Sequence, residues 1–212
     1  MEKAIIGKKV GMTQIFDEVG KVIPVTVIEA GPCVVVQKKE AEKEGYVSVQ
    51  LGFGDAKEKN MSKPERGHFA KGNVGLRKHL KEFKLDNSAE LNVGDEIKAD
   101  AFAEGDCVDI TGISRGKGFA GVVKRHGAAI QRRSHGGGPV HRHAGSMGSG
   151  TSPGKIFKGK MGAGRMGTDK VTIQNLDIVK VDPELNLIAV RGAIPGPRGG
   201  IVYIKSTVKK IG

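Results

Sequence analysis

The stretch Val22-Ile23-Pro24-Val25-Thr26-Val27-Ile28 is the clearest strand signal in the chain, and the rest is interpreted from it. β-Branched residues dominate this stretch, and such side chains favour a pleated, half-buried strand over a helix. Turn signals bound it on both sides, with Asp17-Glu18-Val19-Gly20 before it and Ala30-Gly31-Pro32 after it. This pattern of a short strand between tight turns predicts a fold that is mainly β.

Similar runs occur along most of the chain. The further predicted strands are Cys33–Gln37, Tyr46–Leu51, Asp95–Phe102, Asp106–Thr111, Val171–Val181, Leu187–Val190 and Ile201–Ile204. Roughly eight short strands with tight turns favour a closed antiparallel barrel over an α/β sheet. We assign the barrel to about residues 1–54, 92–114 and 169–212 of a single domain.

Residues from Asp55 to about Leu91 have a different character, because they are polar, rich in Lys and poor in β-branched side chains. Leu76, Leu80 and Phe83 recur at helical spacing. This spacing predicts one or two short helices, inserted between strands over about 55–91. We expect a solvated helical insertion, with a minor RNA contact as the alternative.

The net charge of +12 is concentrated in one segment. Of the 35 Lys and Arg residues, 11 lie in residues 115–168, a segment that contains none of the 23 Asp and Glu. Fifteen residues of this segment are Gly, and its apolar content is too low for a second core. Such a block of charge repels itself and needs a polyanion to order it. Because strands are predicted before and after it, we expect a long loop that is held at both ends.

The kind of polyanion is indicated by what the segment lacks. Phe119 and Phe157 are its only aromatic residues, whereas a single-strand binder usually offers several stacking platforms. No recognition helix with base-reading side chains is visible. A Gly-rich basic extension suits structured RNA that is recognised by its shape and phosphates. Composition alone leaves DNA open as an alternative.

Two nucleotide-binding patterns occur in the segment, and we interpret both as products of its composition. Gly116-Lys117-Gly118-Phe119-Ala120-Gly121 fits G-x-G-x-x-G, but no acidic residue for a ribose follows before Asp169. Gly154–Met161 approaches a P-loop, but Met161 stands where Ser or Thr would bind magnesium. A nucleotide-dependent enzyme therefore remains only as a rival hypothesis.

Metal binding and catalysis fit poorly. His135, His141 and His143 have no Cys or carboxylate nearby, and flanking Arg residues would repel a cation. Ser134 beside His135 has no acid in the segment that would orient the imidazole. We expect no metal, no cofactor and no catalytic residue.

The remaining signals concern location. No apolar run approaches the roughly 20 residues that span a bilayer, and no apolar stretch near Met1 is long enough for a signal peptide. The only cysteines, Cys33 and Cys107, form no C-x-x-C pair. We expect a reduced intracellular protein without a membrane partner.

Six motifs occur in order between Lys3 and about Lys205. They are Gly7–Phe16 (GKKVGMTQIF), Gly112–His126 (GISRGKGFAGVVKRH), Ser134-His135-Gly136, His141-Arg142, Gly145-Ser146-Met147-Gly148 and Pro153–Met161 (PGKIFKGKM). Together they resemble the bacterial large-subunit ribosomal protein L-three family. The resemblance implies a closed six-stranded antiparallel barrel of the kind found in translation factors, a small helical insertion, and a long extended loop that penetrates RNA.

The resemblance also implies a function, which is structural and not enzymatic. The body would bind large-subunit ribosomal RNA near its 3′ end and promote early subunit assembly, while the loop tip would approach the peptidyl-transferase centre. The implied partners are this RNA and neighbouring large-subunit ribosomal proteins, with no small-molecule substrate. The implied location is cytoplasmic, within the large ribosomal subunit.

The resemblance, with the residue types, assigns the candidate site residues. Candidate RNA contacts are Arg115, Lys117, Lys124, Arg125, His126, Arg132, Arg133, His135, Arg142, His143, Lys155, Lys158, Lys160 and Arg165. The candidate loop tip is Gly145, Ser146, Met147, Gly148, Ser149, Gly150, Thr151, Ser152 and Pro153. Some family members carry a methylated Gln in the tip, and this tip has no Gln, so we do not expect that modification.

Overall fold

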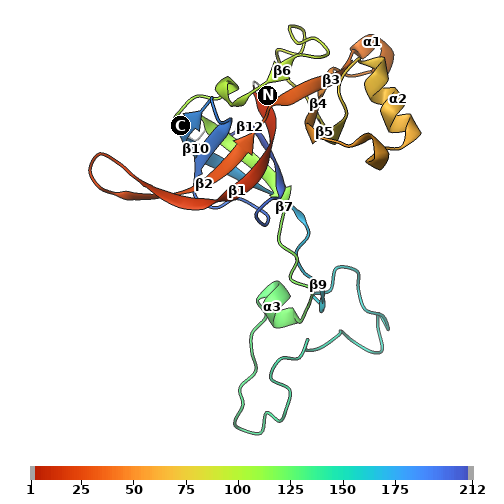
Figure 1. The fold of residues 1–212 in the computed structure, drawn as a ribbon. Coiled ribbons are helices and arrows are strands. Elements are labelled where there is room, and N and C mark those ends of the chain that lie inside the picture. Colours follow the sequence, from red (N-terminus) through yellow and green to blue (C-terminus); the bar gives the residue numbers. More distant parts are fainter. Residues whose placement is uncertain (1–2, 210–212) are drawn as a thin grey trace. The chain divides into compact units, whose positions relative to one another are not determined.

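Six strands close into an antiparallel barrel (Figure 1). The structure is a computed structural model that describes residues 3–209. The barrel strands are β1 (Ala4–Phe16), β2 (Val22–Ala30), β7 (Cys107–Ile113), β10 (Lys170–Asp182), β11 (Leu187–Arg191) and β12 (Ile201–Ser206). Their order around the barrel is β1-β12-β7-β10-β11-β2, and neighbouring strands are antiparallel. The predicted mainly β fold with a closed six-stranded barrel is confirmed.

Branched aliphatic side chains fill the barrel interior, and along β12 they alternate with less buried residues. In β12, Val202 and Ile204 are fully buried, whereas Ile201 and Tyr203 are only half-buried. Other fully buried barrel side chains include Ile5, Ile6, Ile28, Ile110 and Ile188. Burial of an Ile side chain contributes about 1.5–3 kcal/mol relative to exposure, so these buried side chains are the main source of the barrel's stability.

A second, four-stranded sheet forms part of the same core. It contains β3 (Cys33–Lys39), β4 (Ser48–Asp55), β5 (Arg77–Phe83) and β6 (Glu96–Ile97), in the order β5-β4-β3-β6. The assignment of all of residues 1–54 and 92–114 to the barrel is therefore wrong for β3, β4 and β6. Their alternating pattern identifies strands but does not say which sheet each strand joins.

The change of sheet occurs at the turn between β2 and β3. Gly31 has a φ of +89°, a conformation that favours glycine. A Cβ at Gly31 would lie 3.0 Å from the carbonyl oxygen of Ile97. Because consecutive strands β2 and β3 do not pair with each other, the chain leaves the barrel here and starts the second sheet.

The helix predicted from Leu76, Leu80 and Phe83 is wrong, because the chain forms strand β5 there. β5 pairs with β4, with Leu80 opposite Gly52 and Phe83 opposite Val49. Three apolar residues fit helical spacing by chance, and pairing with a neighbouring strand overrides such a weak local pattern. The buried Phe83 ring then packs into the common core.

The insertion does contain a helix, but earlier in the chain. Helix α2 (Lys63–Lys71) follows the short 3₁₀ helix η1 (Glu58–Asn60). Ser62 donates hydrogen bonds from its backbone N–H and its hydroxyl to Glu65 Oε2, both at 2.9 Å. These bonds, the backbone one first, hold the pKa of Glu65 below its usual value. Two shorter helical pieces, α1 (Ala41–Glu44) and η2 (Ala99–Ala101), lie outside the insertion.

Lys9 is a buried lysine that fixes the loop between β11 and β12. Its Nζ donates hydrogen bonds to the carbonyl oxygens of Ile194, at 2.8 Å, and Gly196, at 3.2 Å. A Cβ at Gly196 would lie 2.9 Å from the carbonyl oxygen of Ile113, the last residue of β7. Lys9 therefore positions the backbone of Ile194 and Gly196, and Gly196 lies next to Ile113, the residue directly before the basic segment.

The two cysteines should differ in reactivity. Cys33 is fully buried, its thiol donates to the carbonyl oxygen of Ile6 at 3.3 Å, and burial raises its pKa to about 12. Cys107 is exposed. Alkylation counted by mass spectrometry at mildly alkaline pH should label Cys107 in the native protein, and Cys33 only after denaturant unfolds the barrel. Rapid native labelling of Cys33 would contradict this core.

Candidate nucleic-acid interface

The basic segment forms a compact unit of its own. The chain divides into Ser114–Asp169 and a second unit that contains the residues before and after it. This boundary differs by one residue at each end from the predicted 115–168. Ile113 and Lys170, the flanking residues, are paired across β7 and β10. The barrel therefore holds the two ends of the segment side by side.

The two ends stay joined by hydrogen bonds within the segment. The backbone N–H of Ser114 donates to the carbonyl oxygen of Asp169 at 2.8 Å, and the Thr168 N–H donates to that of Ser114 at 3.2 Å. Further on, the Lys117 N–H donates to the carbonyl oxygen of Met166, and the Met166 N–H donates to the carbonyl oxygen of Gly118, both at 2.9 Å. These bonds lead into the short strands β8 (Phe119–Ala120) and β9 (Gly164–Arg165).

A short helix completes this folded part, which we call the neck and define as residues 114–127 and 162–169. Helix α3 (Val122–His126) follows β8, and Val122 is buried with Ala120. Arg125 Nη1 donates to the carbonyl oxygen of Gly162 at 3.0 Å, and His126 Nε2 lies 3.2 Å from the same oxygen. The sequence did not predict a neck, because backbone hydrogen bonds and glycine turns leave no apolar periodicity.

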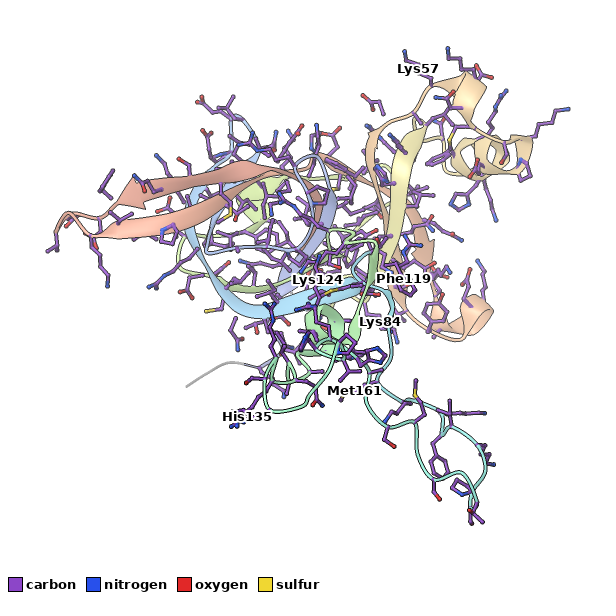
Figure 2. The ribbon with its side chains drawn as sticks, turned by 90° about the horizontal axis from the view of Figure 1, so that it is seen from below. Lys57, Lys84, Phe119, Lys124, His135 and Met161 are labelled. Carbon is purple, nitrogen blue, oxygen red and sulfur yellow. The ribbon has the colours of Figure 1, made fainter. Side chains whose placement is uncertain are left out.

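Residues 128–161, which we call the outer loop, are open chain. Within this stretch the structure has turns and bends but no helix or strand, and residues 129–161 are exposed except for half-buried His141. The hydrogen bonds it shows are local, such as Gln131 N–H to the His141 carbonyl oxygen at 3.1 Å. Figure 2 shows the side chains of His135 and Met161 among those spread along this unit.

All fourteen predicted RNA contacts are exposed, and the structure divides them between these two parts. The neck carries Arg115, Lys117, Lys124, Arg125, His126 and Arg165. The outer loop carries Arg132, Arg133, His135, Arg142, His143, Lys155, Lys158 and Lys160. The nine predicted tip residues, Gly145–Pro153, are exposed as well.

The positive charges of the segment are not neutralised by the protein. Among residues 3–209, every ion pair found lies outside the segment, as in Lys3–Asp106 at 2.9 Å and Lys39–Glu82 at 2.7 Å. Residues 115–168 contain 11 Lys and Arg and no Asp or Glu, and the first acid after them is Asp169. Such an arrangement is suited to a partner that supplies many negative charges at once.

Phe119 is a candidate contact residue that charge alone would not identify. Its ring is 81% exposed although its backbone is paired with Arg165 in the neck. Figure 2 labels Phe119 and Lys124 in this folded part. An exposed ring held on a paired strand beside a cation can stack on a base while the cation neutralises a phosphate.

The rival motifs find no supporting geometry in the described chain. Gly116–Gly121 lies in the neck and leads into α3, a helix of five residues. Within residues 3–209, no three His, Cys, Asp or Glu side chains gather where they could hold a metal ion. No helix in that range is long and apolar enough to cross a membrane.

Comparison with known proteins identifies the family. Residues 70–185 match the family model described as Ribosomal protein L3. The match covers more than half of the 212 residues and includes the whole neck and outer loop. The chain belongs to the ribosomal protein L3 family. This match confirms the resemblance found in the sequence. L3 proteins are structural constituents of the large ribosomal subunit.

The neck can be tested through one glycine. Gly167 has a φ of +79°, and a Cβ there would lie 2.0 Å from the carbonyl oxygen of Arg115. Gly167→Ala should open the neck and speed hydrogen exchange at the Lys117 and Met166 amides at least tenfold. This corresponds to a decrease of about 1.4 kcal/mol in the free energy of local opening.

Gly159→Ala is the matched control for this substitution. Gly159 has a similar φ of +77°, but a Cβ added there would meet no atom within 4 Å. It should leave exchange at Lys117 and Met166 unchanged. Equal exchange in the two variants would show that the neck is not held by this close approach.

Proposed function

We propose that this L3 protein binds large-subunit ribosomal RNA mainly through its acid-free segment, as a structural and not a catalytic component. The observation that carries the proposal is a set of 11 exposed cations without carboxylate partners in one unit of Ser114–Asp169. The rest of the chain is nearly neutral, with 24 basic and 23 acidic residues. RNA phosphates are therefore the expected counter-charges for this unit and not for the barrel as a whole.

The neck and the outer loop would act differently. In the neck, hydrogen bonds hold Lys117, Phe119 and Arg165 in place before RNA arrives. In the outer loop, phosphate neutralisation would order an open chain whose glycines allow close approach to RNA. The proposed order of events is docking by the neck followed by folding of the outer loop onto RNA.

The finer assignments follow from the family and complete the proposal. The body would bind near the 3′ end of the large-subunit RNA and promote early assembly in the cytoplasm. The tip, Gly145–Pro153, would lie toward the peptidyl-transferase centre. Its small and hydroxylated residues keep the backbone accessible to RNA.

Binding should depend steeply on salt. If six to ten phosphates are neutralised, affinity for a large-subunit RNA fragment should fall roughly 10³–10⁵-fold between 50 and 200 mM salt. Arg132→Gln with Arg133→Gln should lower the slope of log affinity against log salt by about two. Lys43→Gln, an exposed lysine between Glu42 and Glu44, should not change it. A flat salt response of the native chain would refute the proposal.

The outer loop should be separable from the rest of the chain. Replacing residues 128–161 with a short Gly linker keeps every hydrogen bond between the two sides of the neck. We expect an unchanged thermal unfolding transition and RNA affinity lowered at least a hundredfold, measured by filter binding. Competition with duplex DNA in the same assay would test the DNA alternative. Loss of the folded barrel would show that the outer loop belongs to the core.

A further inference from the structure

The β1–β2 hairpin continues beyond the barrel as a two-stranded arm, which we define as residues Val10–Pro24. β1 pairs with β12 only as far as Lys8, and β2 pairs with β11 only as far as Val25. β1 and β2 nevertheless remain paired with each other out to Phe16 and Val22. Figure 1 shows this arm as a ribbon that leaves the barrel wall.

The arm exposes apolar side chains on one face. Phe16 is opposite Val22, and Met12 lies on the same face because it is four residues from Phe16 along the strand. The side chains of Phe16, Val22 and Met12 are 61%, 48% and 50% exposed. Pro24 is on this face as well, opposite Gln14. A two-stranded hairpin is at best marginally stable in water, so an apolar arm of this kind indicates a surface that becomes covered.

The turn at the end of the arm is already ordered. Asp17 Oδ1 accepts hydrogen bonds from the backbone N–H groups of Lys21, at 2.7 Å, and Val19, at 3.1 Å. The Asp17 N–H donates to the Lys21 carbonyl oxygen at 3.0 Å. Binding would therefore require little additional ordering of the arm, which favours affinity.

Charge indicates what covers the arm. Between Val10 and Ile28 the only charged residues are Asp17, Glu18 and Lys21, so the arm is net acidic in a chain of +12. The guanidinium of Arg198 lies near Gly11, whose face is opposite to that of Met12. RNA phosphates would repel the acidic end, and they would gain no cation from the apolar face. Met and Phe, by contrast, are enriched at protein interfaces.

We propose that the face formed by Met12, Phe16, Val22 and Pro24 docks on a neighbouring protein of the large subunit. The partner's surface would be apolar and flanked by Lys or Arg, which would pair with Asp17 and Glu18. A second copy of the chain fits less well, because its strongly basic unit is proposed to be occupied by RNA. The proposal takes the large subunit as the setting from the proposed function.

The test uses the full chain in assembled large subunits. A photo-cross-linking amino acid replaces Phe16, Leu185 or Phe119 in separate preparations. Leu185 is the matched control, since it is 66% exposed in the turn between β10 and β11 of the same unit. After irradiation, nuclease and protease digestion followed by mass spectrometry identify each adduct.

We expect position 16 to give an adduct with one ribosomal protein, at an apolar patch beside Lys or Arg, and position 119 to give RNA. An RNA adduct at position 16, an adduct with a second copy, or no more adduct than at position 185 would overturn the docking proposal. A protein adduct at 16 without an RNA adduct at 119 would instead count against the proposed neck contact. The two proposals can therefore fail separately.

Substitutions give a second measurement on the same subunits. In subunits without a cross-linker, Phe16→Ser and Glu18→Lys should each lower at least tenfold the retention, after a salt wash, of the protein identified by the adduct at position 16. Leu185→Ser should not lower it. Asp17 is left unchanged because its carboxylate holds the turn. Protection of Cys33 from alkylation confirms in each variant that the barrel is folded. Unchanged retention in both arm variants would overturn the proposal.

Discussion

The pairing of β7 with β10 is the constraint on which the rest of the structure depends. Ile113 and Lys170 are partners in this pairing, and the residues between them form the whole basic unit. Without it, a segment with 11 cations and no acid before Asp169 would be driven apart by its own charge. The barrel stability that buried Ile side chains supply therefore maintains a loop that could not close itself.

The neck extends this constraint into the segment, mainly with backbone hydrogen bonds and with Arg125 and His126 at Gly162. Bonds between Ser114 and Asp169, and between Lys117 and Met166, need no apolar core. Ordering one residue costs about 1–2 kcal/mol of backbone entropy, so each residue fixed beforehand lowers what RNA must supply on binding. A folded neck with an open outer loop divides that cost between the protein and its partner.

The sequence predicts strands well where β-branched and other apolar residues recur in short runs, as in Val22–Ile28 and Val171–Val181. It does not predict that β3 and β4 form a second sheet, because alternation identifies a strand and not its neighbour. The helix predicted around Leu76–Phe83 was wrong because three apolar residues are too few to separate helix from strand. The fourteen site residues could be proposed from charge and motif, but their division between neck and outer loop depends on hydrogen bonds that leave no pattern in the sequence.

The arm and the basic unit show how one small chain can separate two kinds of recognition. The arm carries apolar side chains, two acids and an ordered turn, so its partner need supply little ordering. The basic unit carries cations and glycines, so under the proposed function its outer loop would take its final shape from the RNA. Exchanging the two compositions would fail in both places, because an acidic loop would be repelled by phosphates and a basic arm by the Lys and Arg of a basic protein. If both proposals hold, the uneven distribution of charge would keep RNA and protein contacts apart along the chain.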